Sequence, residues 1–232
     1  MRLLDVYCCQ GGASAGYEAV GFEVTGVDLA PQPRYEARFP GRFVQGDAVE
    51  FIREHGAEFD AIHASPPCQA YSLAQRIQGR EHPDLIGPTR EALEATGRPW
   101  VIENVAEARG ELRDPVTLCG AAFGLRTYRH RLFEAGGGLV LEQPDHAPHA
   151  TPTVKMGRAL QPGDFYHAVG NFSGVEQVRT DMGVPWMNRD GIRECIPPAY
   201  ARWVGERLMA AASIPIQLSL LASPALDLEK SA

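Results

Sequence analysis

The fold is decided by a stretch near the start of the chain, residues 3–16, which reads LLDVYCCQGGASAG. Its first five residues are mostly apolar, as in a short buried β-strand. The small residues that follow, with Gly11 and Gly12 among them, are typical of a tight turn that leads into a helix. A strand, a glycine turn and a helix form the first unit of an α/β sheet.

The pattern of that first unit repeats through the next hundred residues. Apolar runs predict further strands at 23–28, 43–47, 59–64 and 100–105. The runs between and after them predict helices at 48–55, 88–96 and 199–212. Strands that alternate with helices indicate an α/β fold, with a parallel sheet and helices on both faces. In such a sheet ligands bind beyond the carboxyl ends of the strands.

The alternation weakens after residue 133. A glycine run at 136–138 and several nearby prolines predict loops. We therefore expect a main domain at 1–133, a small second lobe at 134–190, a closing helix within 191–212 and a tail at 213–232.

Composition limits the class of protein. At 232 residues, 44% of them hydrophobic, the chain can bury a sizeable core. A net charge of −7 taken alone disfavours nucleic acid, but Arg126, Arg129, His130 and Arg131 form a compact basic cluster. The sequence has no apolar run of about 18 residues and no secretory signal pattern at its start. We expect a cytoplasmic protein that does not enter a membrane.

The cysteines point to free thiols rather than to a crosslinked scaffold. Their number is odd and no C-x-x-C pair occurs, which disfavours both a disulfide framework and a structural zinc site. His146 and His149 invite a zinc hypothesis, but no cysteine stands near them in the sequence. We expect solvated loop histidines there and no bound metal.

One thiol stands in an unusual loop, SPPCQAYS at residues 65–72. Pro66 and Pro67 stiffen the chain directly after a predicted strand. Cys68 then lies at the ligand edge of the sheet, where a rigid loop suits a nucleophile. A lone cysteine is more often a small buried side chain, but its place in this loop favours catalysis.

Acids follow three predicted strands. Asp28 lies roughly twenty residues after the glycine turn, the usual place for an acid that binds ribose hydroxyls. Together the turn and Asp28 favour an adenosyl ligand, whereas the missing G-x-G-x-x-G pattern disfavours a dinucleotide. Asp47 ends the next strand in the same way. Glu103, in WVIENV at residues 100–105, would hold a proton near neutral pH if it is half-buried. Solvated acids are the plain alternative.

A basic motif, YRHRLF, occupies residues 128–133. If these residues form a strand, Arg129 and Arg131 lie on the same face. Two neighbouring guanidinium groups repel each other unless they share an anionic or carbonyl partner. A solvated basic edge strand is the alternative.

The motifs P-C-Q, E-N-V and R-x-R, in this order, resemble the carbon-5 cytosine methyltransferase family. The resemblance covers residues 3–133 and resumes at 182–208. The length and the endings MGVPWM and IPPAY look like the compact forms encoded by bacteriophages of actinobacteria. The resemblance implies a Rossmann-like, S-adenosylmethionine-dependent methyltransferase sheet, with residues 134–190 as a small target-recognition lobe.

The resemblance also implies roles for single residues. Cys68 adds to carbon 6 of the cytosine, Glu103 hydrogen-bonds N3 and the exocyclic amine, and Arg131 contacts O2. Arg129 supports the site or a phosphate. The residues implied to bind the cofactor are Tyr7, Gly11, Gly12, Asp28, Asp47 and Pro67. The residues implied to shape the catalytic loop and hold the base are Gln69, Ser72 and Asn104.

The function expected from this resemblance is transfer of a methyl group from S-adenosylmethionine to carbon 5 of a flipped-out cytosine in double-stranded DNA. A monomer in the cytoplasm of a bacterial host is expected, and both restriction evasion and a restriction partner stay open. Three departures touch the cofactor pocket: Cys9 replaces a glycine, Thr127 a glutamine, and Arg193-Glu194 a Gly-Asn pair. Arg193 raises the hypothesis of a carboxylated cofactor.

Three other functions compete with this one. A tRNA cytosine-5 methyltransferase would share the architecture but recognise RNA by shape and by its 2′-hydroxyl groups. A non-catalytic DNA-binding protein on the same fold would have no need of the Cys68 thiol. A nicotinamide-dependent oxidoreductase is disfavoured by the missing dinucleotide fingerprint.

Overall fold

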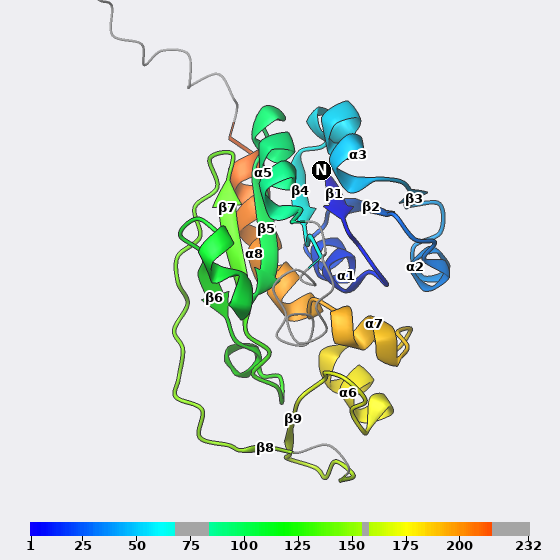
Figure 1. The fold of residues 1–232 in the computed structure, drawn as a ribbon, viewed down its shortest axis with the longest axis vertical. Helices are drawn as coiled ribbons and strands as arrows, with labels where there is room; N and C mark the ends of the chain where they lie inside the picture. Colours follow the sequence, from blue (N-terminus) through cyan, green and yellow to red (C-terminus); the bar gives the residue numbers. More distant parts are fainter. Residues whose placement is uncertain (68–83, 155–157, 215–232) are drawn as a thin grey trace, which may run out of the picture.

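The computed structural model describes residues 1–67, 84–154 and 158–214. Within them a seven-stranded sheet of order β3-β2-β1-β4-β5-β7-β6 runs through the molecule (Figure 1). Its strands are β1 (Arg2–Val6), β2 (Glu23–Asp28), β3 (Phe43–Gln45), β4 (Ala61–Ala64), β5 (Trp100–Val105), β6 (Val116–Leu118) and β7 (Arg131–Gly136). The sheet confirms the predicted α/β class.

The sheet differs from the expected parallel one at its β6 edge. β3, β2, β1, β4 and β5 are parallel, but β7 runs antiparallel to both β5 and β6. No helix of the α/β repeat separates β6 from β7, only the short turn η4 (Gly120–Phe123) and a loop. Since a parallel connection needs a longer crossover, the chain turns back instead.

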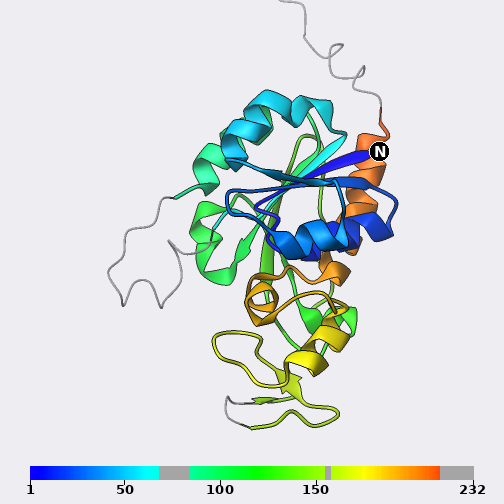
Figure 2. The same cartoon turned by 90° about the vertical axis from the view of Figure 1, so that its right-hand side faces the viewer.

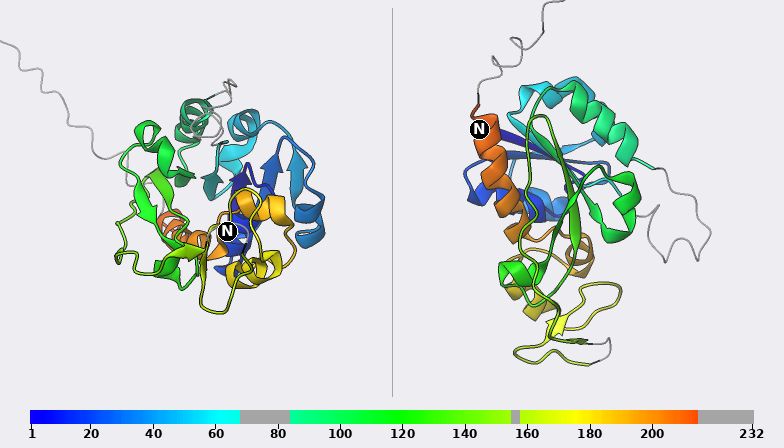
Figure 3. Two further views of the ribbon diagram at one scale, coloured as in Figure 1. Left: turned by 60° about the horizontal axis from the view of Figure 1, so that its bottom comes forward. Right: turned by 90° about the vertical axis from the view of Figure 1, so that its left-hand side faces the viewer.

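Helices cover both faces of the sheet. α1 (Gly12–Ala19) and α8 (Pro198–Ala212) pack on one face, and α3 (Ala48–His55) and α5 (Ile86–Ala95) on the other. The other helices of the described residues are α2 (Pro33–Arg38), α6 (Val175–Met182) and α7 (Arg189–Glu194), with short turns η1 (Gly56–Glu58) and η3 (Ala106–Glu111). Figures 2 and 3 show α8 in orange across the sheet from α3 and α5. The predicted helices at 48–55, 88–96 and 199–212 are confirmed within two residues at each end.

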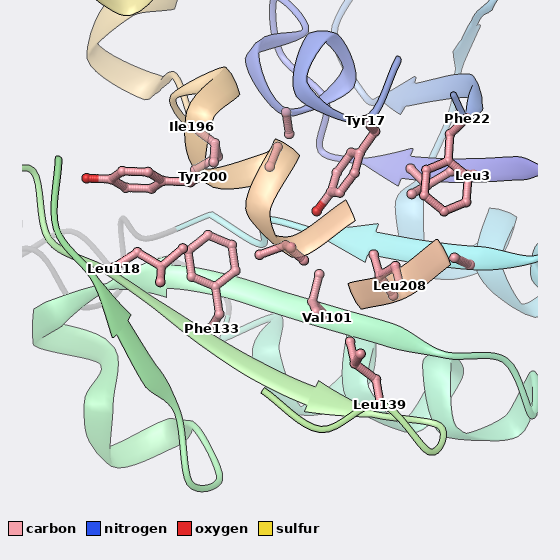
Figure 4. Close-up of a cluster of buried hydrophobic side chains, with 14 of the residues drawn as sticks. Leu3, Tyr17, Phe22, Val101, Leu118, Phe133, Leu139, Ile196, Tyr200 and Leu208 are labelled. Carbon is pink, nitrogen blue, oxygen red and sulfur yellow. The ribbon is translucent and has the colours of Figure 1, made fainter. Parts of the chain in front are cut away.

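Strand periodicity explains the two layers. Leu3 packs in the core cluster that contains α1 and α8, whereas Leu4 packs in the cluster that contains α3 and α5. Neighbouring strand residues point to opposite faces, so one apolar strand serves both cores. Figure 4 shows the first cluster, to which Tyr17 of α1, Phe133 of β7 and Tyr200 of α8 all belong.

Beyond the carboxyl edge of the parallel strands lie α6, α7 and a two-stranded parallel pair, β8 (Thr153–Val154) and β9 (Phe165–Tyr166) (Figure 1). Their apolar side chains form a third cluster that runs from Tyr166 to Cys195. The boundaries expected for the small lobe and the tail stay predictions. Among the described residues, no helix is long and apolar enough to cross a membrane.

Candidate active site

A cavity of about 450 Å³ opens at the carboxyl ends of the parallel strands, where the chain order reverses between β1 and β4. The residues selected from the sequence that line it are Tyr7, Gly12, Asp28, Asp47, Pro67, Glu103, Asn104 and Arg131. Gly11 is the N-cap of α1, directly before Gly12, and is not itself part of the lining. Arg129 lines a neighbouring cavity. Cys68, Gln69 and Ser72 lie outside the described residues.

The turn from β1 into α1 is held in a left-handed backbone conformation. The φ angle is 61° at Tyr7, 46° at Cys9 and 82° at Gly11. Residues other than glycine rarely adopt it, and such strain is of order 1–3 kcal/mol. The Cys9 N–H donates to Asp28 Oδ2 at 2.9 Å, which helps to hold the turn. Cys9, which replaces a glycine of the family pattern, thus occupies a position where glycine would adopt this conformation without strain.

The two glycines of the turn allow close approach of other chain segments. A Cβ atom on Gly11 would lie 2.6 Å from the Phe39 ring. A Cβ atom on Gly12 would lie 2.5 Å from both Cys195 Sγ and the Ile196 carbonyl oxygen. Any side chain at Gly12 would therefore push the segment before α8 away from the cavity.

The two strand-end aspartates are oriented by backbone amides. Asp28 accepts from Cys9 and, at 3.1 Å, from the Ala30 N–H. Asp47 caps α3 by accepting from the Glu50 N–H at 2.9 Å. A carboxylate has about four lone-pair positions, so each aspartate retains acceptor capacity toward the cavity that both line. The pair can accept hydroxyl or amine donors of a ligand.

Glu103 and Arg131 form a buried ion pair across neighbouring strands. Arg131 Nε lies 3.0 Å from Glu103 Oε1, and the Glu103 side chain is only 5% exposed. Burial raises the pKa of Glu103 against the opposing effects of Arg131, Ser65 and Arg129. Apart from this ion pair, Glu103 Oε1 has no hydrogen-bond partner among the described residues. The site thus presents a buried carboxyl group that can still take a hydrogen bond from a ligand.

Asn104 ties this acid to the predicted nucleophile loop. Its Nδ2 donates to the Pro66 carbonyl oxygen at 2.9 Å, and its Oδ1 accepts from the Val105 N–H. Pro67, the last described residue before Cys68, lines the cavity beside Glu103. The described part of the chain therefore ends beside Glu103, one residue before Cys68.

A buried polar chain behind Glu103 escaped the sequence analysis. Tyr17 OH lies 2.6 Å from His63 Nδ1, and His63 Nε2 lies 2.7 Å from Ser65 Oγ, which hydrogen-bonds Glu103. His63 is fully buried, and burial lowers its pKa to about 3, so the ring is neutral. A neutral ring that accepts from Tyr17 and donates to Ser65 would orient Glu103. A lone histidine in an apolar strand carries no sequence signal for this.

Asp5 is a second buried acid beside the cavity. Its Oδ2 accepts from Ser14 Oγ at 2.5 Å, and Ser14 lies 3.1 Å from Tyr35 OH. Burial raises the pKa of Asp5 to about 7, and the hydrogen bonds from Ser14 oppose the rise. Asp5 therefore titrates near neutral pH, although no motif singled it out.

Arg129 differs from the strand geometry considered for it. The residue precedes β7 with a φ angle of 28°, so it does not share a strand face with Arg131. Its guanidinium donates to the carbonyl oxygens of Cys195, Arg193 and Ile192, at 2.7 to 3.2 Å. These carbonyls end α7, so Arg129 fastens that helix to the sheet. This geometry fits a supporting role rather than a contact with phosphate.

A wall of the cavity comes from the far end of the sequence. The Trp186 indole donates to the Gln10 carbonyl at 2.7 Å, while the Gln10 side chain exchanges hydrogen bonds with Asn188. The wall residues are Met187, Gly191, Arg193, Glu194, Cys195 and Ile196. Sequence reasoning placed two of them, Arg193 and Glu194, at this pocket and missed the others.

A second cavity, of about 720 Å³, adjoins the first on the side of the small lobe. Arg131 lines both cavities, and Tyr128, Arg129 and His130 line only the second. A flat or flipped-out group in the larger cavity could reach Arg131 while a ligand fills the smaller one. The two cavities therefore offer adjoining places for two reactants.

The expectation of exposed loop histidines without a metal stays a prediction, but the fold adds a neighbour that the sequence did not indicate. The sequence shows no cysteine near His146 and His149, but the fold brings Cys119 Sγ to 3.5 Å from His149 Nε2. Cys119 follows β6, thirty positions earlier in the chain, so the proximity is a product of tertiary structure alone.

Comparison with known proteins gives this geometry a context. Residues 1–110 match the family model described as C-5 cytosine-specific DNA methylase. The Type II methyltransferase M.AgeI of Thalassovita gelatinovora is 26% identical over 182 residues, which cover 63% of this chain and 42% of that protein. M.AquIA of Picosynechococcus is 24% identical over 209 residues, covering 69% of this chain and 84% of the relative. M.FnuDI of Fusobacterium nucleatum is 30% identical over 86 residues, 36% of this chain and 25% of that protein. The chain thus spans less than half the length of two of these relatives.

Solved structures share the fold. A crystallised candidate DNA modification methyltransferase from an E. coli prophage matches with a TM-score of 0.61, covering 91% of this chain and 99% of its own. The Entamoeba histolytica methyltransferase EhMeth also matches with a TM-score of 0.61, covering 90% and 98%. Sequence identity is 16% and 11%, so these two matches bear on the fold alone.

Proposed function

The family model and the curated relatives support a cytosine-5 methyltransferase family for this chain, and from that premise we propose its reaction. The chain transfers a methyl group from S-adenosylmethionine to carbon 5 of cytosine in DNA. The observation that carries the proposal is the buried Glu103–Arg131 ion pair, which lines the cavity beside the chain that leads to Cys68.

The smaller cavity suits the cofactor. Asp28 and Asp47 offer acceptors for ribose hydroxyls and the adenine amine, and Gly12 lets Cys195 and Ile196 approach closely to form the wall of the cavity. Glu194 lines the same cavity and would face the positive charge of a sulfonium ligand. When bound, S-adenosylmethionine supplies an electrophilic methyl group.

The form of the cofactor that we propose is the ordinary one. Arg193 is the residue that suggested an extra carboxylate on the cofactor, but its guanidinium pairs with Asp190. That ion pair partly neutralises Arg193, and the nearby Glu194 would repel a second carboxylate.

Cys68, Glu103 and Arg131 would together activate the cytosine ring toward methyl transfer. The Cys68 thiolate attacks carbon 6, and the electron pair of the C5–C6 bond becomes available at carbon 5. Carbon 5 takes the methyl group as the sulfonium S–CH3 bond breaks, which releases S-adenosylhomocysteine. A water or hydroxide then takes the carbon-5 proton, the C5–C6 double bond re-forms and the Cys68 thiolate leaves. Burial raises the pKa of Glu103, which favours a carboxyl proton that is donated to N3 while charge builds on the ring. Arg131 neutralises O2 from the boundary of the two cavities.

DNA has to present an unstacked base to such a site. The reacting carbons lie inside the duplex, so the cytosine is flipped out for a few kcal/mol of lost stacking. The larger cavity, with Arg131 at its inner end, is the place we propose for the flipped base. Its lining by residues 149–153 and 167–169 would let the small lobe contact the flanking DNA.

The test uses duplex DNA that contains 5-fluorocytosine, from which the final proton loss cannot occur. Incubation with the protein and S-adenosylmethionine should leave a covalent protein–DNA adduct visible by mass spectrometry. Cys68→Ala should form none while it still binds S-adenosylhomocysteine. Wild-type protein without an adduct would favour a non-catalytic DNA-binding protein, and transfer to tRNA but not to duplex DNA would favour a tRNA enzyme.

A further inference from the structure

Four potential metal ligands converge outside the proposed active site. Cys119 begins η4 after β6, His130 stands directly before β7, and His146 and His149 lie on the segment that follows β7. Each side chain contributes one ligand atom, and the four atoms all lie within 4.8 Å of one another. Three parts of the chain that are separate in sequence thus aim their donor atoms at one point.

Three of the six distances within the cluster are close to the edges of a metal tetrahedron, and all six are within 4.8 Å. His130 Nε2 lies 3.0 Å and His149 Nε2 lies 3.2 Å from His146 Nε2, and Cys119 Sγ lies 3.5 Å from His149 Nε2. With Zn–N and Zn–S bonds of about 2.05 and 2.3 Å, tetrahedral geometry gives edges of about 3.3 Å for N–N and about 3.6 Å for N–S. These three contacts therefore have the spacing of neighbouring ligands in a zinc shell.

Hydrogen bonds alone do not account for this convergence. Each imidazole Nε2 carries either a proton or a lone pair, never both. His146 Nε2 faces the Nε2 atoms of both His130 and His149, so a single proton or a single lone pair would have to serve two contacts. Stacking of His149 on Tyr128, with ring centroids 3.5 Å apart, orients the ring plane but does not require the nitrogens to meet.

We propose that Cys119, His130, His146 and His149 bind one structural Zn²⁺ ion. All four positions of the tetrahedron come from the protein, which is the mark of a structural rather than a catalytic zinc site. One thiolate with three neutral imidazoles is a ligand set that suits zinc, whereas magnesium and calcium take oxygen ligands. On binding, the Cys119 thiol loses its proton to the buffer as the sulfur–zinc bond forms.

The ion would fasten the segment after β7 to the edge of the sheet. That segment runs along the β6 edge before it reaches β8 (Figure 1), and Gln143 there bonds both backbone groups of Thr117 at 2.8 Å. Tyr128 OH donates to the Thr151 carbonyl oxygen at 2.7 Å a few residues beyond His149. Few apolar side chains of the segment are buried, so a metal supplies the attachment that a core would otherwise give.

The site also adjoins the larger cavity. His130 and His149 line it together with Arg131, the next residue after His130. Zinc would therefore hold one wall of the proposed base-binding cavity in place. Metal binding itself is independent of the proposed methyl transfer, so its test does not depend on activity.

The first experiment counts zinc in the full chain prepared without an affinity tag, because a histidine tag would bind the metal itself. Protein stripped with a chelator is incubated with zinc, desalted and measured by inductively coupled plasma mass spectrometry. We expect one zinc per wild-type chain and less than about 0.2 in Cys119→Ser and His149→Ala. The matched control is His167→Ala, an exposed histidine of the same cavity outside the cluster, which should keep one zinc.

A spectrum identifies the ligands. Cobalt added to the zinc-free chain should give the intense visible bands of a tetrahedral ion and a near-ultraviolet thiolate-to-cobalt band. Cys119→Ser should lose the thiolate band. His146→Ala, at an exposed position that cannot disturb the core, should lose the tetrahedral spectrum while its circular dichroism stays native.

A wild-type chain that retains less than about 0.1 zinc, or a weak octahedral cobalt spectrum, would overturn the proposal. A thiolate band that survives in Cys119→Ser would overturn it equally.

Discussion

Glu103 is buried with a cation on one side and a hydrogen-bond chain on the other, and both contacts act on its proton. Arg131 and Ser65 favour the charged carboxylate, but burial outweighs them and raises the pKa. The Tyr17–His63–Ser65 chain fixes the carboxyl group without adding charge, because His63 is neutral. The residue is thus set to donate a proton at pH values where an exposed glutamate has lost it.

Replacing Glu103 with glutamine tests that role. Since the raised pKa keeps the carboxyl protonated to higher pH, wild-type kcat/KM should fall on the alkaline side as Glu103 ionises. Glu103→Gln cannot ionise, so this alkaline fall should vanish, and the rate at neutral pH should drop roughly 100-fold. Steady-state rates across pH measure both effects, with exposed Glu54→Gln as control. A variant within threefold of wild type, or with an unaltered alkaline limb, would contradict the role.

Asp5 leads to a prediction about stability rather than rate. Its folded-state pKa is about 7 against the ordinary aspartate value of 3.8, so the folded chain holds a proton that the unfolded chain has released between those pH values. The contribution to stability is present below pH 3.8 and is lost as pH rises toward 7, by up to about 1.4 kcal/mol per pH unit. Asp5→Asn should remove this slope.

Urea unfolding of Asp5→Asn and wild type between pH 4 and 7 measures the slope. The free energy of unfolding of wild type should decline relative to that of Asp5→Asn across the range. Exposed Glu36→Gln serves as the matched surface control and should follow wild type. Parallel curves for wild type and Asp5→Asn would mean that Asp5 is ionised in the folded protein.

Among the elements, α1 and α8 make a close helix pair that depends on a glycine. A Cβ atom on Gly16 would lie 2.3 Å from the Pro198 carbonyl oxygen and 2.7 Å from Ala201 Cβ. The backbone there cannot yield without moving the start of α8, so Gly16→Ala should lower the free energy of unfolding by about 1–3 kcal/mol.

Gly87 of α5 provides the matched control for this helix pair. No atom of the described residues lies within 4 Å of a Cβ atom built there, so Gly87→Ala should raise the free energy of unfolding by up to about 1 kcal/mol. Urea denaturation of both variants decides the point. Equal effects of the two substitutions would show that helix propensity, not packing, governs Gly16.

The sequence pattern predicted a strand or helix well wherever the residues of that one element were enough to specify it. The alternation of Leu3 and Leu4 between two cores, and the proline start of α8, are readable from neighbouring residues. The antiparallel direction of β7 was not, because direction depends on the partner strand. The left-handed φ angle of Arg129 was equally hidden, since it follows from contacts with the carbonyls of α7.

At the scale of the whole molecule, the cavity joins the two ends of the sequence. Motif spacing located Tyr7, Asp28, Asp47 and Glu103, because strand ends in a parallel sheet meet at one edge. The wall from α7 carries few chemical signals of its own. Its place depends on the contacts that Gln10 makes with Trp186 and Asn188, about 180 positions away. The Cys119 cluster was missed for the same reason.

A cavity built from both ends of the chain should make cofactor binding a stabiliser of the whole fold. S-adenosylhomocysteine at 100 times its Kd adds about 2.7 kcal/mol, which corresponds to a rise in Tm of roughly 5–10 °C for a chain of this length. Gly12→Ala should abolish the shift, because its Cβ atom would displace Cys195 and Ile196 from the cavity wall. Gly110→Ala, with no described atom within 4 Å of its Cβ position, should keep it.

Thermal scans with and without the ligand measure the shift. A wild-type Tm that does not change in millimolar S-adenosylhomocysteine would argue against adenosyl binding. A Tm shift in Gly12→Ala equal to that of wild type would mean that the ligand binds outside this cavity.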